Sequence, residues 1–305
     1  MKELYKKHRP KTFKNVLGQN LTAIQKHVEK GTVPQTILLS GPSGCGKTTI
    51  GRILKRKLHC NDGDFNEMNA AQETGIDAIR KIDKRLYTSL SLTGGQSRIW
   101  LIDECHMLSK PAQNSLLKML EDTPANTYFL LATTDPQKLL KTIQNRAMKI
   151  TLKALSDSTI LELLEHVCSK EGIDIHTDVQ SKIVEYASGS ARQALVYLDT
   201  VYQLDDTDKM LNAIVSVSME AQAIEIARAL IGKPTWKKMG PLLKNVKDED
   251  PEGIRRLVLA YTSAIMRNGS MLPQCYLILD AFSESYFYTG HAGLCKSCYE
   301  VVSPI

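Results

Sequence analysis

The chain has 305 residues, a length that predicts about two domains rather than one small core. Hydrophobic residues make up 43% and aromatic residues 6%, which is typical of a helix-rich globular protein. No run reaches the length of a membrane span, the N-terminal MKELYKKHRP has no apolar signal core, and seven scattered cysteines make no disulfide framework. We therefore expect a cytoplasmic protein without a membrane partner.

The net charge of +6 is distributed unevenly along the chain. Residues 1–60 carry thirteen lysines and arginines against two acidic residues, so this segment has a net charge of +11 and the remainder −5. A basic lobe attracts phosphate groups, whether of a nucleotide or of a nucleic acid. Solubility is the other interpretation, and charge alone does not decide between them.

Short apolar runs alternate with helical patterns in the first half of the chain. The helical stretches include Thr48–Leu58 and Pro111–Glu121. The runs expected to be strands are Thr36–Leu39, Phe65–Met68, Ile99–Ile102, Tyr128–Ala132 and Met148–Leu152. This alternation predicts an α/β fold in which a parallel sheet is covered by helices on both faces.

No strand pattern follows residue 153, and the rest of the chain has helical patterns. Ser158–Lys170, Asp178–Ala187 and a third helix capped by Ser190 predict a compact three-helix unit. The polar stretch Leu204–Lys209 is interpreted as a linker, after which helical patterns continue to the last residue. The predicted domains are therefore 1–153, 154–208 and 209–305.

The segment GPSGCGKT at 41–48 has the spacing of a P-loop, G-x-x-x-x-G-K-[ST]. An apolar strand runs into it and a helix leaves it, which is the structural context that the motif requires. Its three glycines allow backbone N–H groups to surround a phosphate at the helix N-terminus. Lys47 would reach the β- and γ-phosphates of a nucleotide, and Thr48 would ligate Mg²⁺.

The segment RIWLIDECH at 98–106 places two carboxylates at the C-terminal end of a predicted buried strand. Asp103 can hold Mg²⁺ through water, and Glu104 can orient the water that attacks a phosphoryl group. Two buried acids without a metal would be costly, so a purely structural role is disfavoured. His106 could be a metal ligand, but no suitably spaced His or Cys supports this, and a histidine at a helix start is the favoured interpretation.

The strand before Thr133 and Thr134 brings two hydroxyl groups to the sheet edge that carries the P-loop. A hydroxyl there could sense the γ-phosphate or hold the attacking water, although threonines also cap loops. Arg192, in GSARQAL at 189–195, is expected in the first turn of a helix, where the dipole disfavours a cation. A nearby phosphate would reverse this cost, and a solvated surface arginine is the alternative.

Arg146, in QNRAMKI at 144–150, precedes its strand and is therefore expected at the sheet edge opposite the P-loop. A strand of five residues spans about 17 Å, which is too far for this side chain to reach the nucleotide of its own chain. A structural ion pair is one interpretation. The other is an arginine finger that completes the ATP site of a neighbouring subunit.

Seven segments, taken in order, resemble the motifs of clamp-loader ATPases of the AAA+ superfamily. They are YKKHRPKTFKNVLGQ, GPSGCGKTT, WLIDECHMLS, NSLLKMLEDTP, FLLATTDPQKL, QNRAMKI and GSARQAL. Bacterial gamma/tau subunits are the most similar, and small subunits of replication factor C are similar too, with GIDAIR at 75–80 closer to the latter. The resemblance covers residues 4–205 and implies an AAA+ core at 1–153, a three-helix lid at 154–208 and, by analogy, a helical collar at 209–305.

The resemblance also implies a role for each matching residue. Catalysis would rest on Lys47, Asp103, Glu104, Thr134 as sensor 1, Arg146 as a finger acting in trans, and Arg192 as sensor 2. ATP would be held by His8, Arg9, Leu17, Gly41, Pro42, Ser43, Gly44, Cys45, Gly46, Lys47, Thr48, Thr49 and Arg192, and Mg²⁺ by Thr48 and Asp103. Arg80 and Lys84 would face backbone phosphates of DNA, with a solvated helix face as the alternative, and Gln113 would couple that helix to the catalytic site.

Two departures from the family pattern stand out. The finger motif has Asn145 and Ala147 around its arginine where the family has serine and cysteine. Of the four cysteines of the bacterial zinc module only Cys60 remains, and Cys295 and Cys298 form a lone pair, so zinc is expected at neither place. We expect no tau-like extension after the collar, which would favour a phage or another streamlined replisome as the source.

We therefore expect an ATPase subunit of a sliding-clamp loader that uses ATP and Mg²⁺. Its partners would be other loader subunits in a homo- or hetero-pentamer, a ring-shaped clamp and primer–template DNA. One alternative is a non-hydrolysing scaffold subunit, which the intact catalytic residues disfavour. A DExH-type helicase, suggested by DECH at 103–106, would need a second RecA-like domain that the helical second half does not offer.

Overall fold

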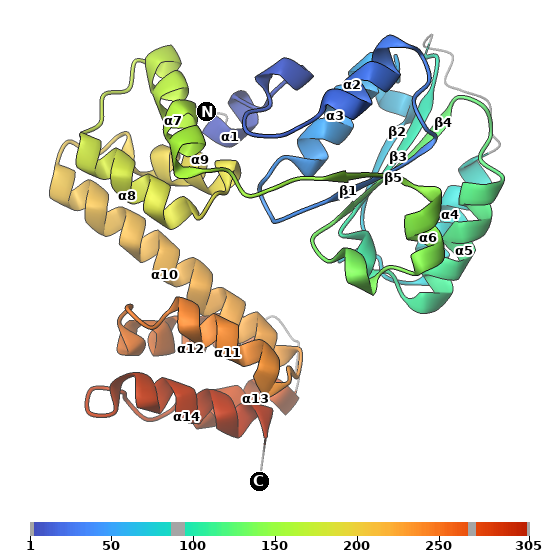
Figure 1. Cartoon of the computed structure of the whole chain (residues 1–305). Helices are drawn as coiled ribbons and strands as arrows, with labels where there is room; N and C mark the ends of the chain where they lie inside the picture. Colours follow the sequence, from blue (N-terminus) through green and yellow to red (C-terminus); the bar gives the residue numbers. More distant parts are fainter. Residues whose placement is uncertain (1–2, 87–94, 268–272, 304–305) are drawn as a thin grey trace. The chain divides into compact units, whose positions relative to one another are not determined.

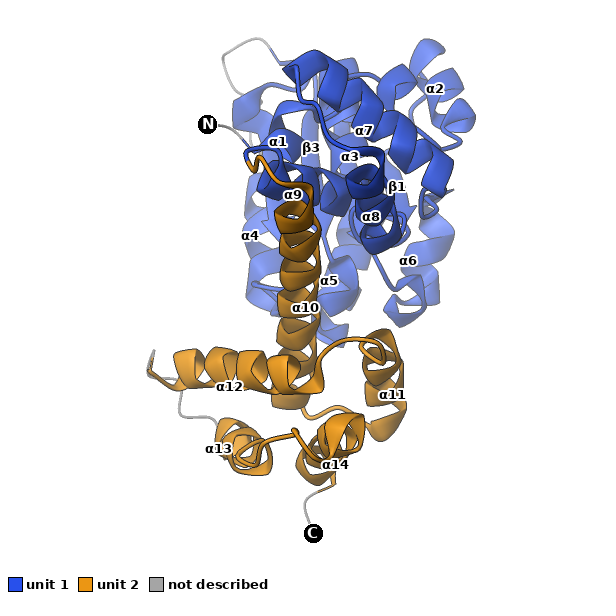
Figure 2. Ribbon diagram, turned by 90° about the vertical axis from the view of Figure 1, so that its left-hand side faces the viewer, with its two compact units in different colours: residues 1–203 blue, residues 204–305 orange. Residues whose placement is uncertain are grey.

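The computed structural model describes residues 3–86, 95–267 and 273–303. The chain divides into two compact units, Met1–Gln203 and Leu204–Ile305, which are coloured separately in Figure 2. Helices α1 (Leu4–Lys7) and α2 (Thr22–Glu29) open the first unit. None of the helices in the described part of the chain is long and apolar enough to cross a membrane.

The first unit is built on a five-stranded parallel sheet with the strand order β2-β3-β4-β1-β5 (Figure 1). Its strands are β1 (Thr36–Ser40), β2 (Phe65–Asn69), β3 (Arg98–Asp103), β4 (Thr127–Thr133) and β5 (Met148–Thr151). All five strands predicted from the sequence are confirmed, with bounds that differ by one residue or less. The α/β class is confirmed as well.

Burial explains why these segments are strands. All five residues of β1 are buried, and β3 and β4 are buried almost throughout, because central strands of a parallel sheet are covered on both faces. The edge strands β2 and β5 mix exposed and covered positions. Successive side chains of β1 point to opposite faces, so Leu38 joins one hydrophobic core while Ile37 and Leu39 join the other.

Helices cover both faces of the sheet (Figure 1). On one face α2 and α3 (Lys47–Lys57) contribute Ile24, Ile50 and Ile53 to the core. The opposite face is covered by α4 (Ile76–Leu86), α5 (Lys110–Glu121) and α6 (Lys141–Arg146). The P-loop follows β1, and the two predicted catalytic acids lie at the end of β3. Both of these strands are therefore packed against helices on both faces of the sheet.

Three helices follow the sheet within the first unit: α7 (Asp157–Glu171), α8 (Thr177–Ala187) and α9 (Ala191–Val201). The Ser156 and Ser190 hydroxyls cap α7 and α9 by accepting backbone N–H groups, and Gly172 ends α7 in the left-handed conformation. These helices lie where the sequence predicts them. The proposed boundary at residue 153 remains a prediction.

The second unit is helical, with α10 (Thr207–Ile231), α11 (Trp236–Asn245), α12 (Pro251–Arg267), α13 (Pro273–Ala281) and α14 (Gly290–Val302) around one core. The predicted linker Leu204–Lys209 is too long, because the Asp206 carboxylate caps α10 by accepting the Lys209 N–H at 3.0 Å. Helix α10 therefore begins inside that polar stretch.

A buried carboxylate organises the second unit. Glu252 is only 4% exposed and accepts hydrogen bonds from Arg255 at 2.6 and 2.8 Å and from Arg256 at 3.1 Å. It also accepts the backbone N–H of Tyr286 at 2.8 Å. Arg255 donates in turn to the Phe282 and Ser283 carbonyls, so this network ties α12 to the segment between α13 and α14.

Candidate functional site

The P-loop connects β1 to α3 with a backbone that only glycine tolerates easily. Gly41, Gly44 and Gly46 have φ angles of +149°, +75° and +106°. A Cβ atom on Gly44 would lie 2.0 Å from the Ser190 hydroxyl, and one on Gly41 would lie 2.4 Å from the Leu152 carbonyl oxygen. The loop is therefore packed tightly at Gly41 and Gly44, and it leads into the N-terminus of α3, where an anion site would lie.

Lys47 lies at the first position of α3 and is only 6% exposed. Its ammonium group donates to the Gly41 and Pro42 carbonyls at 2.8 Å each. Within the described residues, no carboxylate lies within ion-pair distance of this cation. A buried cation that has only neutral acceptors at a helix N-terminus fits a polyphosphate, whose negative charge would compensate it.

Oxygen donors for a divalent cation meet next to this loop. The Thr48 hydroxyl donates to the Asp103 carboxylate at 3.0 Å, so the two predicted metal ligands lie side by side. Among the described residues no group of three or more His, Cys, Asp and Glu side chains could hold a metal ion. This donor set fits Mg²⁺, which takes one or two protein oxygens together with phosphate oxygens and water, and does not fit a metal that needs a full protein cage.

Glu104 lies at the end of β3 in the left-handed conformation, with a φ of +49° that is unusual for a residue other than glycine. Its backbone N–H donates to Asp103, and its side chain accepts a hydrogen bond from the Thr134 hydroxyl at 3.1 Å. Since β3 and β4 are neighbours, the ends of both strands meet here. The sequence-predicted catalytic residues of the two strands are therefore in direct contact.

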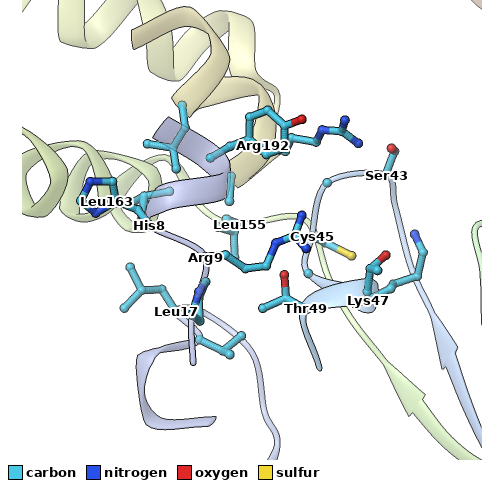
Figure 3. Close-up of a pocket in the computed structure, with 18 of the residues that line it drawn as sticks. His8, Arg9, Leu17, Ser43, Cys45, Lys47, Thr49, Leu155, Leu163 and Arg192 are labelled. Atoms are coloured by element: carbon cyan, nitrogen blue, oxygen red, sulfur yellow. The ribbon is translucent and has the colours of Figure 1, made fainter. Parts of the chain in front are cut away.

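A pocket opens between this edge of the sheet and the helices that flank it (Figure 3). The predicted residues His8, Arg9 and Leu17 line it together with P-loop residues 43–48, Thr49, Asp103, Glu104 and Arg192, whereas the predicted Gly41 and Pro42 do not line it. His8 makes a 2.6 Å contact with Glu171 of α7, which fastens the N-terminal segment to the helical part of the unit. Burial lowers the pKa of Arg9.

Sequence reasoning missed several residues that line the same pocket: Tyr5, Pro10, Asn15, Val16, Leu155, Leu163, Ala191 and Leu195. The apolar members of this set give one side of the pocket a surface suited to a flat, largely apolar group such as a nucleobase. Tyr5 lies within the segment YKKHRPKTFKNVLGQ, but no role was predicted for it. Leu163 and Leu195 follow helical spacing and resemble ordinary core positions, so no local signal marks them.

Arg192 lies in the first turn of α9, close to the P-loop. A Cβ on Gly44 would lie 3.4 Å from the Cβ of Arg192, and the guanidinium group stands over the Tyr5 ring at 4.9 Å. Figure 3 shows the side chain extending toward Ser43. The start of α9 therefore faces the same space as the P-loop, as the phosphate interpretation requires.

Arg146 lies where the strands of the sheet begin, at the opposite end from the P-loop. It is the last residue of α6, and β5 begins two residues later in register with the beginning of β1, where Ile37 pairs with Met148. The guanidinium forms an ion pair with Glu121 at the end of α5 and donates to the Thr142 carbonyl at 3.4 Å. The predicted placement away from its own P-loop is confirmed, and the acidic partner comes from 25 residues earlier in the chain.

The remaining predicted residues lie on α4 and α5. Arg80 and Lys84 are exposed on α4, and Arg80 pairs with Asp77 at 2.9 Å. Gln113 is buried at 3% exposure in α5 and donates to the Leu108 carbonyl at 3.0 Å. Its side-chain oxygen accepts the Leu140 N–H at 2.9 Å. Gln113 thus joins α5 to the segment that follows β4 and Thr134.

The parallel sheet, the P-loop, the paired acids after β3 and the helices beyond β5 define an AAA+ ATPase. Solved structures of the RuvB Holliday junction branch migration motor from Thermotoga maritima share this fold. One is 23% identical and covers 73% of this chain and 79% of that chain with a TM-score of 0.57. A single-residue variant of RuvB from the same organism is 21% identical and covers 87% of this chain and 93% of that chain with a TM-score of 0.58.

Sequence comparison narrows this class to one family. The family model described as "DNA polymerase III, delta subunit" matches residues 64–156. The DNA polymerase III subunit gamma of Buchnera aphidicola (Schizaphis graminum strain) is 33% identical over 80% of this chain and 73% of its own length. The tau subunit of Salmonella typhimurium is 34% identical over 75% of this chain but only 39% of its own, longer chain. The chain belongs to the DNA polymerase III gamma/tau family.

Proposed function

We propose that the protein is an ATPase subunit of a sliding-clamp loader, acting in DNA replication. In this proposal several copies, with or without a divergent partner, form a pentamer that opens a ring-shaped clamp and loads it onto primer–template DNA. The observation that carries the proposal is the contact of Thr48 with Asp103 and of Thr134 with Glu104 beside Lys47, in a chain of the gamma/tau family. A scaffold subunit that does not hydrolyse ATP would have no use for this arrangement.

The described residues suggest how the site would act on ATP. The P-loop N–H groups and Lys47 would bind the β- and γ-phosphates, and the apolar side of the pocket would hold the base. Mg²⁺, held by Thr48 and Asp103, would neutralise phosphate charge when bound. Glu104 would orient the attacking water, and the Thr134 hydroxyl would keep this carboxylate in place.

Hydrolysis in this proposal needs a second protomer. Arg146 is too far along the sheet to serve its own ATP, and it lies on the surface with 37% of its side chain exposed. We assign it as a finger for the γ-phosphate of a neighbour, a role worth about 10³–10⁵ in rate. Helices α7–α9 would form the lid that carries Arg192, and the second unit would form the collar.

DNA would act through α4 in this scheme. Arg80 and Lys84 are exposed and would contact backbone phosphates without reading sequence. Gln113 would transmit the position of the neighbouring α5 to the Thr134 segment. Stimulation of hydrolysis by DNA and clamp would follow from this connection.

A loading assay tests the proposal. Labelled ring clamp, circular primed DNA, the purified protein with its partner subunits and ATP are mixed, and clamp retained on the circle is separated by gel filtration. We expect retention that depends on ATP and is lost with Lys47→Ala. ATP-independent retention, or directional duplex unwinding by the chain alone, would contradict the proposal and favour a scaffold or a helicase respectively.

A further inference from the structure

His106 lies directly beside the carboxylate that the proposed mechanism uses. The left-handed backbone at Glu104 turns the chain into the short helix η3 (Cys105–Met107), so the side chains of Glu104 and His106 meet on one side of the turn. His106 Nδ1 lies 3.3 Å from Glu104 Oε2 and 3.0 Å from the Thr133 hydroxyl oxygen. Only 9% of the His106 side chain is exposed, so water competes little for these contacts.

The surrounding groups indicate which way the hydrogen bonds run. A neutral Nδ1 without a proton would point its lone pair at the Glu104 carboxylate, which is electrostatically unfavourable. A protonated Nδ1 donates to that carboxylate instead. The Thr133 hydroxyl oxygen already accepts the Asp135 backbone N–H at 3.0 Å, which fixes its position beside the ring. Nδ1 forms its hydrogen bond with this hydroxyl at 3.0 Å, so a proton on Nδ1 would lie between the Thr133 oxygen and Glu104 Oε2.

Glu104 Oε2 accepts a hydrogen bond from Thr134, and His106 Nδ1 lies 3.3 Å from the same oxygen. Within the described residues no hydrogen bond or ion pair reaches Oε1 of this carboxylate. Together the Thr134 hydroxyl and the His106 ring would restrict the side-chain rotamer and leave the other oxygen to accept from water. His106 follows β3 and Thr134 follows β4, so neither can compensate for the other by a small shift.

We propose that His106 is a positioning residue for hydrolysis: with a proton on Nδ1 shared between Thr133 and Glu104, its ring holds Glu104 Oε2 so that Oε1 faces the attacking water. This inference rests on the proposed function, because it assigns Glu104 the role of orienting that water. It gives the histidine of DECH a function in phosphoryl transfer that needs no metal bond. The competing interpretation is that His106 merely fills space under the end of β4.

The test compares two substitutions of the same side chain in the full-length protein with its partner subunits, clamp and primed DNA. His106→Ala removes the donor, whereas His106→Asn puts an amide N–H near the position of Nδ1. We expect His106→Ala to lower kcat for ATP about 10- to 100-fold, the effect of one charge-assisted hydrogen bond. The dissociation constant for a fluorescent ATP analogue should not change, and His106→Asn should recover most of kcat.

The controls separate this inference from the proposed function. His166→Ala removes an exposed histidine of α7 and should leave all values at wild type. Glu104→Gln should abolish hydrolysis; if it did not, the proposed role of Glu104 would fail. If Glu104→Gln were inactive while His106→Ala kept the wild-type kcat, the positioning role alone would be wrong. Equal losses in His106→Ala and His106→Asn would equally overturn it, because they would indicate packing.

Discussion

Each of the two units buries a charged side chain, and the two charges are treated in opposite ways. Glu252 of the second unit is satisfied by two arginines and a backbone N–H. Lys47 of the first unit is buried almost as deeply but has only two neutral carbonyls. A buried charge whose partners are all present holds the fold together, whereas a buried charge without a counter-charge is left to interact with a ligand. The comparison predicts that removing Lys47 weakens ATP binding, whereas removing Glu252 lowers the stability of the second unit.

Lys47→Ala should have the broadest functional effect, because it removes ATP binding and every step that depends on it. We expect ATP affinity to fall at least about 100-fold, because the main cation for the β- and γ-phosphates is lost. The unfolding temperature should not fall, since a buried cation without a counter-charge is removed. Titration with a fluorescent ATP analogue and calorimetry of the same sample measure both quantities. If Lys47→Ala bound ATP with normal affinity, or lost much of its stability, the contrast drawn between Lys47 and Glu252 would be wrong.

Arg146→Ala tests a third kind of charge, one paired at the surface. Its ion pair with Glu121 should contribute less than about 1 kcal/mol to stability. We expect ATP binding to be retained and DNA-stimulated hydrolysis to fall about 10³-fold or more. Phosphate release with clamp and primed DNA present checks this. A wild-type rate would show that Arg146 is a structural surface residue.

Glu252→Ala should destabilise the second unit by about 3–5 kcal/mol, because it leaves two arginines without their shared buried partner. ATP binding to the first unit should not change. Calorimetric unfolding of this variant checks the prediction, with the exposed Glu284→Ala as the matched control. An unchanged unfolding temperature in Glu252→Ala would mean that the network does not hold this unit together.

The smallest effect concerns pH. The hydrogen bond from Arg255, followed by those from Tyr286 and Arg256, lowers the pKa of Glu252 to about 2, from an ordinary value of 4.5. Because the folded pKa is depressed, the stabilisation is complete above the ordinary value and is lost as pH falls toward about 2. We expect Glu252→Gln to lower the unfolding temperature less at pH about 3 than at pH about 6. An equal effect at both would contradict the assignment.

Much of this architecture could be predicted from the sequence. The strands were readable because central parallel strands are continuous apolar runs, and the P-loop because its glycines and lysine are contiguous. Thr134 and Glu104 were predicted to share a sheet edge, and they touch. The contact of His106 with Glu104 was not predicted, because it depends on the left-handed backbone at Glu104, which no residue type announces. Glu252 was missed although Arg255 and Arg256 follow it by three and four residues, because its burial and its contact with the Tyr286 N–H arise only on folding.

The central claim is that each catalytic centre is shared by two protomers. Lys47→Ala chains carry an intact Arg146, and Arg146→Ala chains carry an intact nucleotide site, so the most direct measurement is ATP hydrolysis by a mixture of the two with clamp and primed DNA. The account predicts that each variant alone is nearly inactive and that co-assembled mixtures regain hydrolysis at the mixed interfaces. Mixed assemblies that stay as inactive as the separate variants would contradict it.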